Sequence, residues 1–249
     1  MGSGLPVKIF EEIRKDIINE VYPIDSKLPP ERELAKRYGA SRFAVREAIA
    51  MLGQSGFVKT HPQSGSYILD FYKDGSLETL VQTLRIRQTI DRQTLDSLFK
   101  YRYTTETSAA AEAAVRMADK DLAFLNENLK QKGSNLESIP VLANLDYDFH
   151  FKIITVSENI INKLIFQSFK PVYYFFTEFF YSLTGTAEKS LELNYALLEA
   201  FKKRNPGLAS SAMGNILKYG EQRVYESIDD REQLIVIQPG TQSRVSDKI

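Results

Sequence analysis

The N-terminal part of the chain alternates short amphipathic segments with turn signals. Ile9, Ile13 and Ile17 recur at the spacing of one helix face. Gly39 stands where a helix C-terminus is expected, and Ser41 is a natural N-cap for the apolar-periodic run that follows. The pattern therefore predicts three helices, over residues 6–20, 31–38 and 42–54.

Two β-prone runs follow the third helix. Residues 57–60 and 66–69 flank the turn sequence HPQSG, which predicts a β-hairpin. Three helices and a hairpin in this order are typical of a winged helix-turn-helix, which presents one helix to the major groove of DNA. The alternative is a small α+β module with no nucleic-acid role.

Beyond Asp74 the pattern is helical until the tail. Residues 77–84 predict a connecting helix, and further helices are expected over 94–117, 119–132, 138–157, 160–184, 187–204 and 207–228. Pro171 is expected to kink its helix, and the last segment to hold a short strand and a loose end. The predicted fold is mainly α: a winged helix-turn-helix joined to an all-α helical bundle. The expected domains are 1–72 (winged helix-turn-helix), 73–92 (linker helix), 93–232 (helical domain) and 233–249 (tail).

Charge is balanced over the whole chain but not locally. The 32 basic and 32 acidic residues cancel, whereas from Glu31 to Lys59 six basic residues, the first of them Arg32, stand against three acidic ones. Such a basic stretch favours phosphate contacts. Because there is no cysteine, disulfides and thiolate metal sites are excluded. No apolar run approaches about 18 residues and no leader-type apolar region opens the chain, so we expect a cytoplasmic protein without a membrane partner.

The leading turn of the third helix carries the candidate DNA contacts. Arg42 and Arg46 are i, i+4 neighbours, and a guanidinium binds guanine or phosphate in bidentate fashion. The alternative is a solvated helix surface on which they pair with Glu33 or Glu47. His61, at the hairpin tip, either donates to a phosphate or is an idle surface imidazole. The predicted contacts are Arg32, Ser41, Arg42, Phe43, Ala44, Arg46, His61 and Gly65.

The run LPPERELAKRYGASRFAVREAIAMLGQSGFVKTHPQSGSYI resembles the N-terminal domain of GntR-family regulators. It matches that family's LPxERELA, S-R-x-x-V-R-E-A and L-x-x-x-G patterns in kind, spacing and order, and the wing ends in a similar G-[ST]-[FY]-[VI] sequence. The resemblance implies DNA contacts at Arg32, Ser41, Arg42, Arg46, His61 and Gly65. Where the family often has a second wing glycine, this chain has Gln63.

The second half resembles, more loosely, the FCD effector domain of the FadR subfamily. The pattern R-x-x-x-E occurs at Arg102 and Glu106, and D-x-x-F-H runs from Asp146 to His150. In many members an Asp and three His residues bind a divalent metal, and here two of the histidine positions are Asn194 and Asn215. Amide oxygens are poor ligands for zinc or nickel beside imidazole, which argues against tight metal binding. The resemblance leaves Asp146 and His150 as candidate metal ligands and indicates no other cofactor.

A polar cavity remains the expected effector site, because a few convergent polar groups orient a small molecule. The candidate effector-binding residues are Arg102, Asp146, His150, Asn194, Asn215 and Tyr173. Tyr173 belongs to an aromatic segment, residues 170–181, which either contacts a partner subunit or lines a hydrophobic cavity. The expected effector is a small carboxylate or sugar acid, or alternatively a fatty acyl-CoA. The alternative is that His150 is a core residue hydrogen-bonded to a neighbour and that Asn194 and Asn215 cap or bridge helices without contacting a ligand.

Together these features predict a homodimeric, effector-modulated DNA-binding regulator, and family resemblance favours a repressor on double-stranded operator DNA. An enzyme using His150 and Asp146 as an acid–base pair is a weaker reading, because no nucleophile motif or phosphate-binding glycine loop accompanies them. A structural helical protein that uses its N-terminal module for protein contacts is the remaining alternative.

Overall fold

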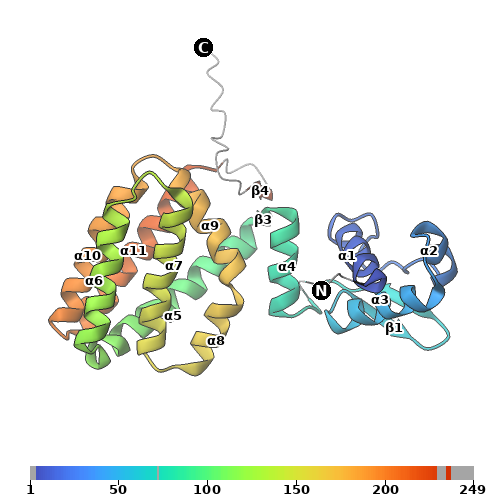
Figure 1. Cartoon of the computed structure of the whole chain (residues 1–249), viewed down its shortest axis with the longest axis horizontal. Helices are drawn as coiled ribbons and strands as arrows, with labels where there is room; N and C mark the ends of the chain where they lie inside the picture. The colour runs from blue at the N-terminus through green and yellow to red at the C-terminus, as the bar shows by residue number, and fades with distance from the viewer. Residues whose placement is uncertain (1–3, 72, 229–233, 237–249) are drawn as a thin grey trace, which may run out of the picture. The chain divides into compact units, whose positions relative to one another are not determined.

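The computed structural model describes residues 4–71, 73–228 and 234–236. Its contacts divide the chain into two units between Arg87 and Gln88, which falls within the expected linker. As predicted, the fold is mainly α, with a small hairpin in the first unit (Figure 1). Among the described residues, no helix combines the length and apolarity needed to cross a bilayer.

The first unit packs its helices around one apolar core. Its elements are α1 (Leu5–Ile18), α2 (Glu31–Arg37), α3 (Arg42–Gln54), β1 (Val58–His61), β2 (Gly65–Ile68) and α4 (Leu77–Arg87). The helix face predicted from Ile9, Ile13 and Ile17 is buried, and it packs with Leu34 and Leu52. Burying this face against α3 stabilises the unit by roughly 1.5–3 kcal/mol for each large apolar side chain.

The hairpin is the expected wing, in antiparallel register from Val58 opposite Ile68 to His61 opposite Gly65. Its turn places Gln63 at φ 61°, in the left-handed region where a glycine is usual. Gly65 has φ 112°, and a Cβ there would lie 2.6 Å from Cε of Lys27. The wing therefore forms without the family's second glycine, but it holds Gln63 in a strained conformation.

The second unit is a helical bundle. Its helices are α5 (Arg92–Arg116), α6 (Asp119–Gly133), α7 (Ile139–Val156), α8 (Ile160–Ser168), α9 (Lys170–Ser182), α10 (Thr186–Lys202) and α11 (Pro206–Glu226). α5 packs along α11, and α7 lies against α5, α6 and α9 (Figure 1). The alanine run Ala109–Ala114 allows this close packing, because Ala110, Ala113 and Ala114 are fully buried in the core.

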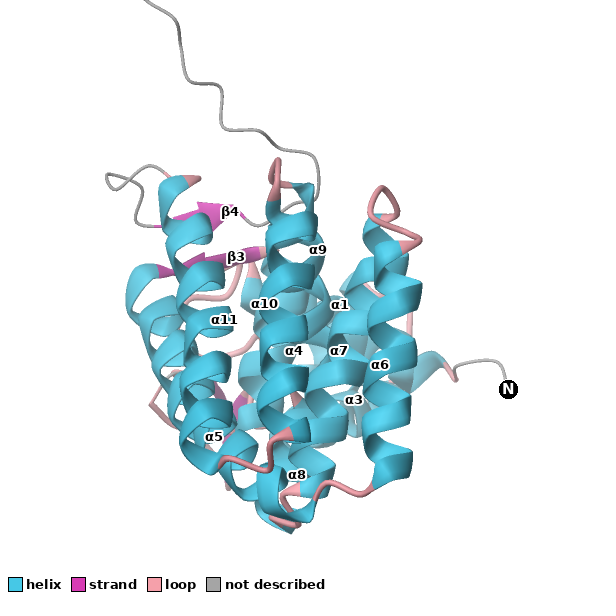
Figure 2. Ribbon diagram, turned by 90° about the vertical axis from the view of Figure 1, so that its left-hand side faces the viewer, coloured by secondary structure: helices cyan, strands magenta, loops and turns pink. Residues whose placement is uncertain are grey.

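Two features differ from the sequence prediction. The expected helix over 160–184 is two helices, since Pro171 stands in the first turn of α9 and ends the run instead of kinking it. The predicted tail strand is β4 (Leu234–Val236), and it pairs with β3 (Thr89–Asp91), which the sequence pattern did not indicate. Figure 2 shows this pair across one end of the bundle. The predicted loose end after β4 lies outside the described residues.

Candidate functional site

The leading turn of α3 projects polar and aromatic side chains into solvent. Ser41 has extended backbone angles, and its hydroxyl accepts a hydrogen bond from the Ala44 backbone N–H at 3.1 Å, so it is the N-cap predicted from sequence. Arg42 and Phe43 follow, and Phe43 is 69% exposed. The Phe43 ring therefore does not belong to the core of this unit.

Arg42 and Arg46 lie on this surface and share one carboxylate. Arg46 donates to Glu31 through Nε at 2.9 Å and Nη2 at 2.8 Å, and Arg42 Nη2 lies 3.8 Å from the same residue. Both arginine side chains are 66% exposed. The expected alternative partners, Glu33 and Glu47, are not the ones used. The Arg46 hydrogen bond lowers the pKa of Glu31, so the carboxylate is charged at neutral pH.

The other predicted DNA contacts divide into exposed and buried positions. Arg32 is exposed at the start of α2, and His61 is exposed on the wing with its ring edge-on to Tyr67 at 5.7 Å. Ala44 is only 6% exposed and packs in the core, so the prediction that its side chain contacts DNA is wrong. The reason is helical geometry, because Ala44 lies on the same face as the buried Ala48.

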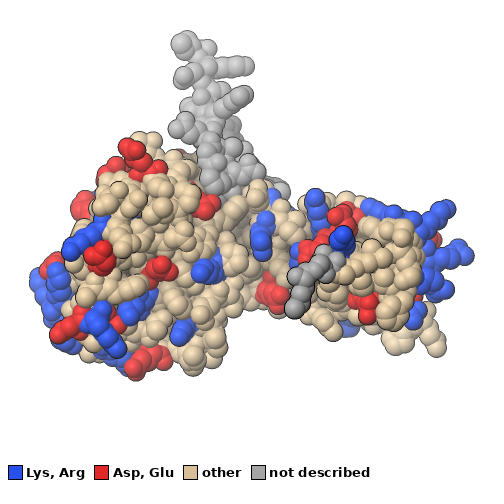
Figure 3. Space-filling view, viewed as in Figure 1, with Lys and Arg blue, Asp and Glu red and all other residues tan. Residues whose placement is uncertain are grey.

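An open groove between α3 and the wing was not foreseen. Lys27, Arg46 and Lys59 line it, together with Gln63 and Gly65 of the wing turn. Figure 3 shows basic side chains gathered over the end of this unit that carries α2. Lys27 gave no signal because it lies in the turn before α2, and only the fold brings it against Gly65.

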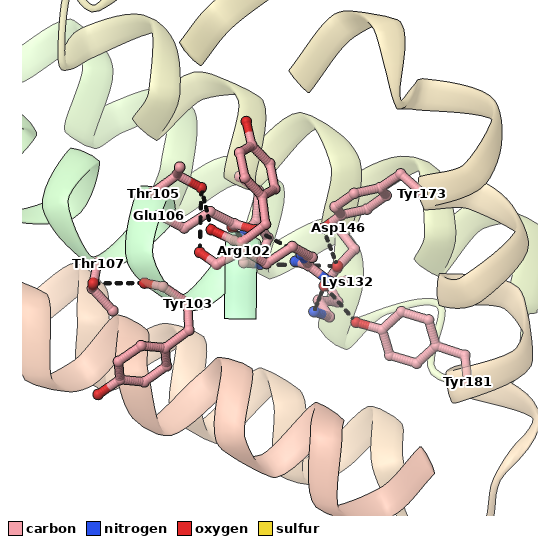
Figure 4. Close-up of polar contacts among 11 residues, drawn as sticks. Arg102, Tyr103, Thr105, Glu106, Thr107, Lys132, Asp146, Tyr173 and Tyr181 are labelled. Atoms are coloured by element: carbon pink, nitrogen blue, oxygen red, sulfur yellow. Dashed lines mark hydrogen bonds and ion pairs between the residues drawn. The ribbon is translucent and has the colours of Figure 1, made fainter. Parts of the chain in front are cut away.

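In the second unit, Asp146 of α7 is the centre of a buried polar cluster. Its Oδ1 accepts from Lys132 Nζ at 3.0 Å and from the Tyr181 hydroxyl at 2.7 Å. Its Oδ2 accepts from the Tyr173 hydroxyl at 2.7 Å. Both tyrosines point inward from α9 toward this carboxylate (Figure 4). Burial opposes ionisation, but the Lys132 ammonium, His150 and the two tyrosine hydroxyls together outweigh it and hold the pKa of Asp146 well below its ordinary value.

Glu106 of α5 forms a second, adjoining set of charged contacts. Arg102 Nε donates to one oxygen at 2.6 Å, and His150 Nδ1 lies 2.5 Å from the other. Burial alone would raise the pKa of Glu106, but Arg102 and then His150 lower it to about 2. The carboxylate in turn raises the pKa of Arg102 against the effect of burial. Glu106 thus orients both Arg102 and His150.

A cavity opens beside these two sets of contacts. Arg102, Asp146, His150 and Ser190 form its polar side, and its apolar walls include Phe99, Phe176, Phe180, Ile216 and Leu217. Its free space is about 60 Å³, room for about two water molecules. A second, apolar space of about 40 Å³ lies on the other side of Phe99, Arg102 and Phe176, and Tyr173 lines it.

The predicted effector residues are only partly brought together. Arg102, Asp146 and His150 line the first cavity, and Tyr173 the second. Asn194 is fully buried but absent from both linings. Asn215 is exposed on α11, so its assignment to the cavity is wrong. The face of α11 that lines the cavity carries Ile216 and Leu217 instead. Aromatic residues of α9 line the cavities, which favours the cavity interpretation of residues 170–181 over a partner contact for those side chains.

Two members of the cluster, Lys132 and Tyr181, were missed. Tyr181 was seen only as part of the aromatic run, and Lys132 sits in the polar stretch at the end of α6 with no motif around it. Glu106 appeared in the R-x-x-x-E pattern but without a role. A buried lysine is rare enough that sequence alone gives no signal for it.

The metal that the resemblance implies does not fit these residues. Both oxygens of Asp146 already accept hydrogen bonds, and one of them faces the Lys132 ammonium. His150 Nδ1 is turned to Glu106, and its Nε2 lies 3.9 Å from Asp146. A divalent ion next to Asp146 would have to stand beside a buried ammonium, and like charges at this distance repel strongly.

Comparison with known proteins agrees with this arrangement. The family described as "Bacterial regulatory proteins, gntR family" matches residues 5–68, and the family "FCD domain" matches residues 97–219. The first match lies within the first structural unit and the second match lies within the second unit.

Several characterised regulators are similar to the chain. The Uxu operon regulator of Haemophilus influenzae is 26% identical over 236 residues, covering 89% of this chain and 82% of the relative. The fatty acid metabolism regulator protein of Pectobacterium atrosepticum is 26% identical over 213 residues, covering 85% and 86%. The HTH-type regulator Mce2R of Mycobacterium tuberculosis is 27% identical over 170 residues, covering 68% and 70%.

Among solved structures, Lar, which controls expression of the Listeria monocytogenes agr system, has the same fold over most of its length. The TM-score is 0.60 at 20% identity, covering 91% of this chain and 99% of that one. At this identity the likeness concerns the fold alone.

Proposed function

The chain belongs to the GntR family of bacterial regulatory proteins and carries an FCD domain, and from this we propose that it is a transcriptional regulator that binds operator DNA through α3 and the wing, with an affinity set by an effector in the helical domain. The observation that carries the proposal is the exposed leading turn of α3. There Arg42, Phe43 and Arg46 face solvent together at a capped helix start.

The mechanism follows from the chemistry of these groups. The guanidinium groups of Arg42 and Arg46 exchange the Glu31 carboxylate for guanine edges or phosphates when α3 enters the major groove. Lys27 and Lys59, on the groove beside the wing, supply phosphate contacts that give affinity and salt dependence but no sequence preference. Arg32 and His61 extend the same surface.

DNA binding is tested by replacing the arginine pair. Selection of binding sequences from a random library, followed by fluorescence anisotropy, gives the affinity of the wild type for its preferred site. Arg42→Ala combined with Arg46→Ala should weaken that affinity by at least about 10-fold, because each base contact contributes about 1–3 kcal/mol. Arg116→Ala, which removes an exposed arginine from the helical domain, is the matched control. Equal affinity of both variants would reject the DNA-binding role.

We place two copies of the chain on DNA, as a symmetric homodimer with one winged domain per half-site of a pseudo-palindrome, acting as a repressor in the cytoplasm. Light scattering should then give twice the chain mass of 28.4 kDa, and the selected sequences should be inverted repeats. A monomer with a non-repeated site would contradict this.

For the effector we favour a small carboxylate or sugar acid. Arg102 lies at the wall of the polar cavity with only Nε hydrogen-bonded among the described residues. Its remaining N–H groups suit a carboxylate. The similarity to the Uxu operon regulator points the same way. The second, apolar space and the similarity to fatty acid metabolism regulators support the rival, a fatty acyl-CoA.

A thermal-shift screen separates the two classes. Sugar acids and small organic acids should raise the Tm of the protein and weaken DNA binding, and acyl-CoA thioesters should do neither. The reverse result assigns the site to the acyl-CoA class, and no response to either class rejects both. We assign no catalytic role to Asp146 and His150, since both oxygens of Asp146 accept hydrogen bonds and His150 Nδ1 is paired with Glu106.

A further inference from the structure

Lys132 is a fully buried lysine whose ammonium is saturated with hydrogen-bond acceptors. Its Nζ donates to Asp146 Oδ1 and to Ser190 Oγ, each at 3.0 Å. In the amide orientation that satisfies both of its groups, the Asn194 oxygen accepts from Nζ at 3.1 Å, and its nitrogen donates to the Ser190 carbonyl at 3.0 Å. An ammonium has three N–H donors, and all three are used here. The Tyr181 ring lies 5.2 Å from Nζ.

Two of these three acceptors coincide with positions where the family resemblance implies metal ligands. Asp146 is the carboxylate of that ligand set, and Asn194 replaces one of its histidines. Both are oriented toward Nζ of Lys132, which enters from α6. Lys132 is therefore a cation held by residues that correspond to a metal site.

We infer that the Lys132 ammonium permanently occupies the cation position of this domain and makes its effector site independent of metal. The substitution at Asn194 agrees with this, because an amide supplies an acceptor oxygen to the ammonium and a donor to the Ser190 carbonyl, and so leaves no polar group of the pair unmatched. A lone buried carboxylate at Asp146 would need a positive partner, and Lys132 is that partner.

One consequence concerns recognition of the effector. In a metal-containing site an acidic ligand coordinates the ion directly. Here the cation is the Lys132 ammonium, which does not line the cavity. Asp146 and Ser190 line the cavity and separate the ammonium from it. The arginine at the wall is Arg102, whose Nε is paired with Glu106, so an acidic effector binds through hydrogen bonds to the other N–H groups of this guanidinium. This rests on the proposed effector site, whereas the metal independence does not.

The inference is tested without DNA or effector. The wild-type protein is purified without chelator, its metal content is measured, and its Tm is recorded with EDTA and with ZnCl₂. We expect no stoichiometric metal and an unchanged Tm in both. One bound metal per chain, or a Tm lowered by EDTA, would overturn the inference.

Two variants test whether the ammonium itself keeps metal out. Asn194→His restores a histidine but keeps Lys132, and it should show no response to ZnCl₂. Asn194→His combined with Lys132→Ala removes the ammonium, and ZnCl₂ should raise its Tm by about 5 °C. An equal zinc response in the single variant, or none in a folded double variant, would show that Lys132 does not hold the cation position. The wild-type measurements decide the matter even where a variant does not fold.

Discussion

Glu31 and Arg46 form a bidentate ion pair across the helix-turn-helix, with N–O distances of 2.9 and 2.8 Å. The pair joins the first residue of α2 to the exposed face of α3, and Arg42 lies 3.8 Å from the same carboxylate. Because the pair is exposed to solvent, it contributes little to the stability of the fold. Its effect is on binding, since the carboxylate competes with phosphate and bases for the same guanidinium groups.

Replacing Glu31 by Gln should strengthen non-specific DNA binding and weaken discrimination. One negative charge leaves the surface, and Arg46 is freed to bind any phosphate. We expect affinity for random duplex DNA to rise by about 3- to 10-fold, with a smaller gain for the preferred site. Anisotropy titrations at several salt concentrations measure both. Glu33→Gln makes the same charge change on α2 and should have the smaller effect; equal effects would contradict the argument.

Two substitutions in the wing turn should change the free energy of unfolding in opposite directions. Gln63→Gly should raise the free energy of unfolding by about 1 kcal/mol, because φ 61° is strained for glutamine and free for glycine. Gly65→Ala should lower it by about 1–3 kcal/mol, because φ is 112° and the new methyl meets Lys27. Calorimetry of the full chain measures both. A loss of stability in Gln63→Gly would show that the turn is not strained at this residue.

The winged domain was predictable because its signals are local. Ser41 as N-cap, Gly39 after α2 and the turn between β1 and β2 each act within a few residues, and the apolar spacing of α1 needs only one partner face. Ala44 was misplaced because the motif describes sequence positions, whereas the helix turns that side chain into the core.

The effector domain was less predictable because its site depends on long-range contacts. The role of Lys132 follows only from the fold, in which α7 brings Asp146, and α10 brings Ser190 and Asn194, to its ammonium. Asn215 was placed by resemblance alone, although the buried Met213, Ile216 and Leu217 show which face of α11 is inward. The pairing of β3 with β4 joins segments from opposite ends of the unit, which no local pattern reveals.

Because Glu106 is buried in its charged form, we expect the helical domain to lose stability in acid. Its pKa is lowered from 4.5 to about 2 in the folded state, so its contribution is fully present above pH 4.5 and is lost as pH falls toward 2. The difference corresponds to about 3 kcal/mol. Urea unfolding followed by circular dichroism between pH 6 and 3 measures the loss. Glu106→Gln should be less stable near neutrality, because Arg102 and His150 lose their partner, but its stability should fall less with acid. An unchanged pH slope in this variant would contradict the assignment.

Lys132 and Asp146 form the buried pair whose removal should harm the fold most. Lys132→Met leaves the Asp146 carboxylate buried without a countercharge and should lower the free energy of unfolding by about 3–5 kcal/mol. Lys152→Met, at the more exposed pair with Asp121, is the matched control and should change it by less than about 1 kcal/mol. Asp146→Asn in the Lys132→Met background removes the uncompensated charge and should recover much of the loss, so the two substitutions are non-additive in a double-mutant cycle. Additive effects would mean that the ammonium and the carboxylate do not stabilise each other, and the Asp146 charge would then have to be compensated by the hydroxyl groups of Tyr173 and Tyr181 alone.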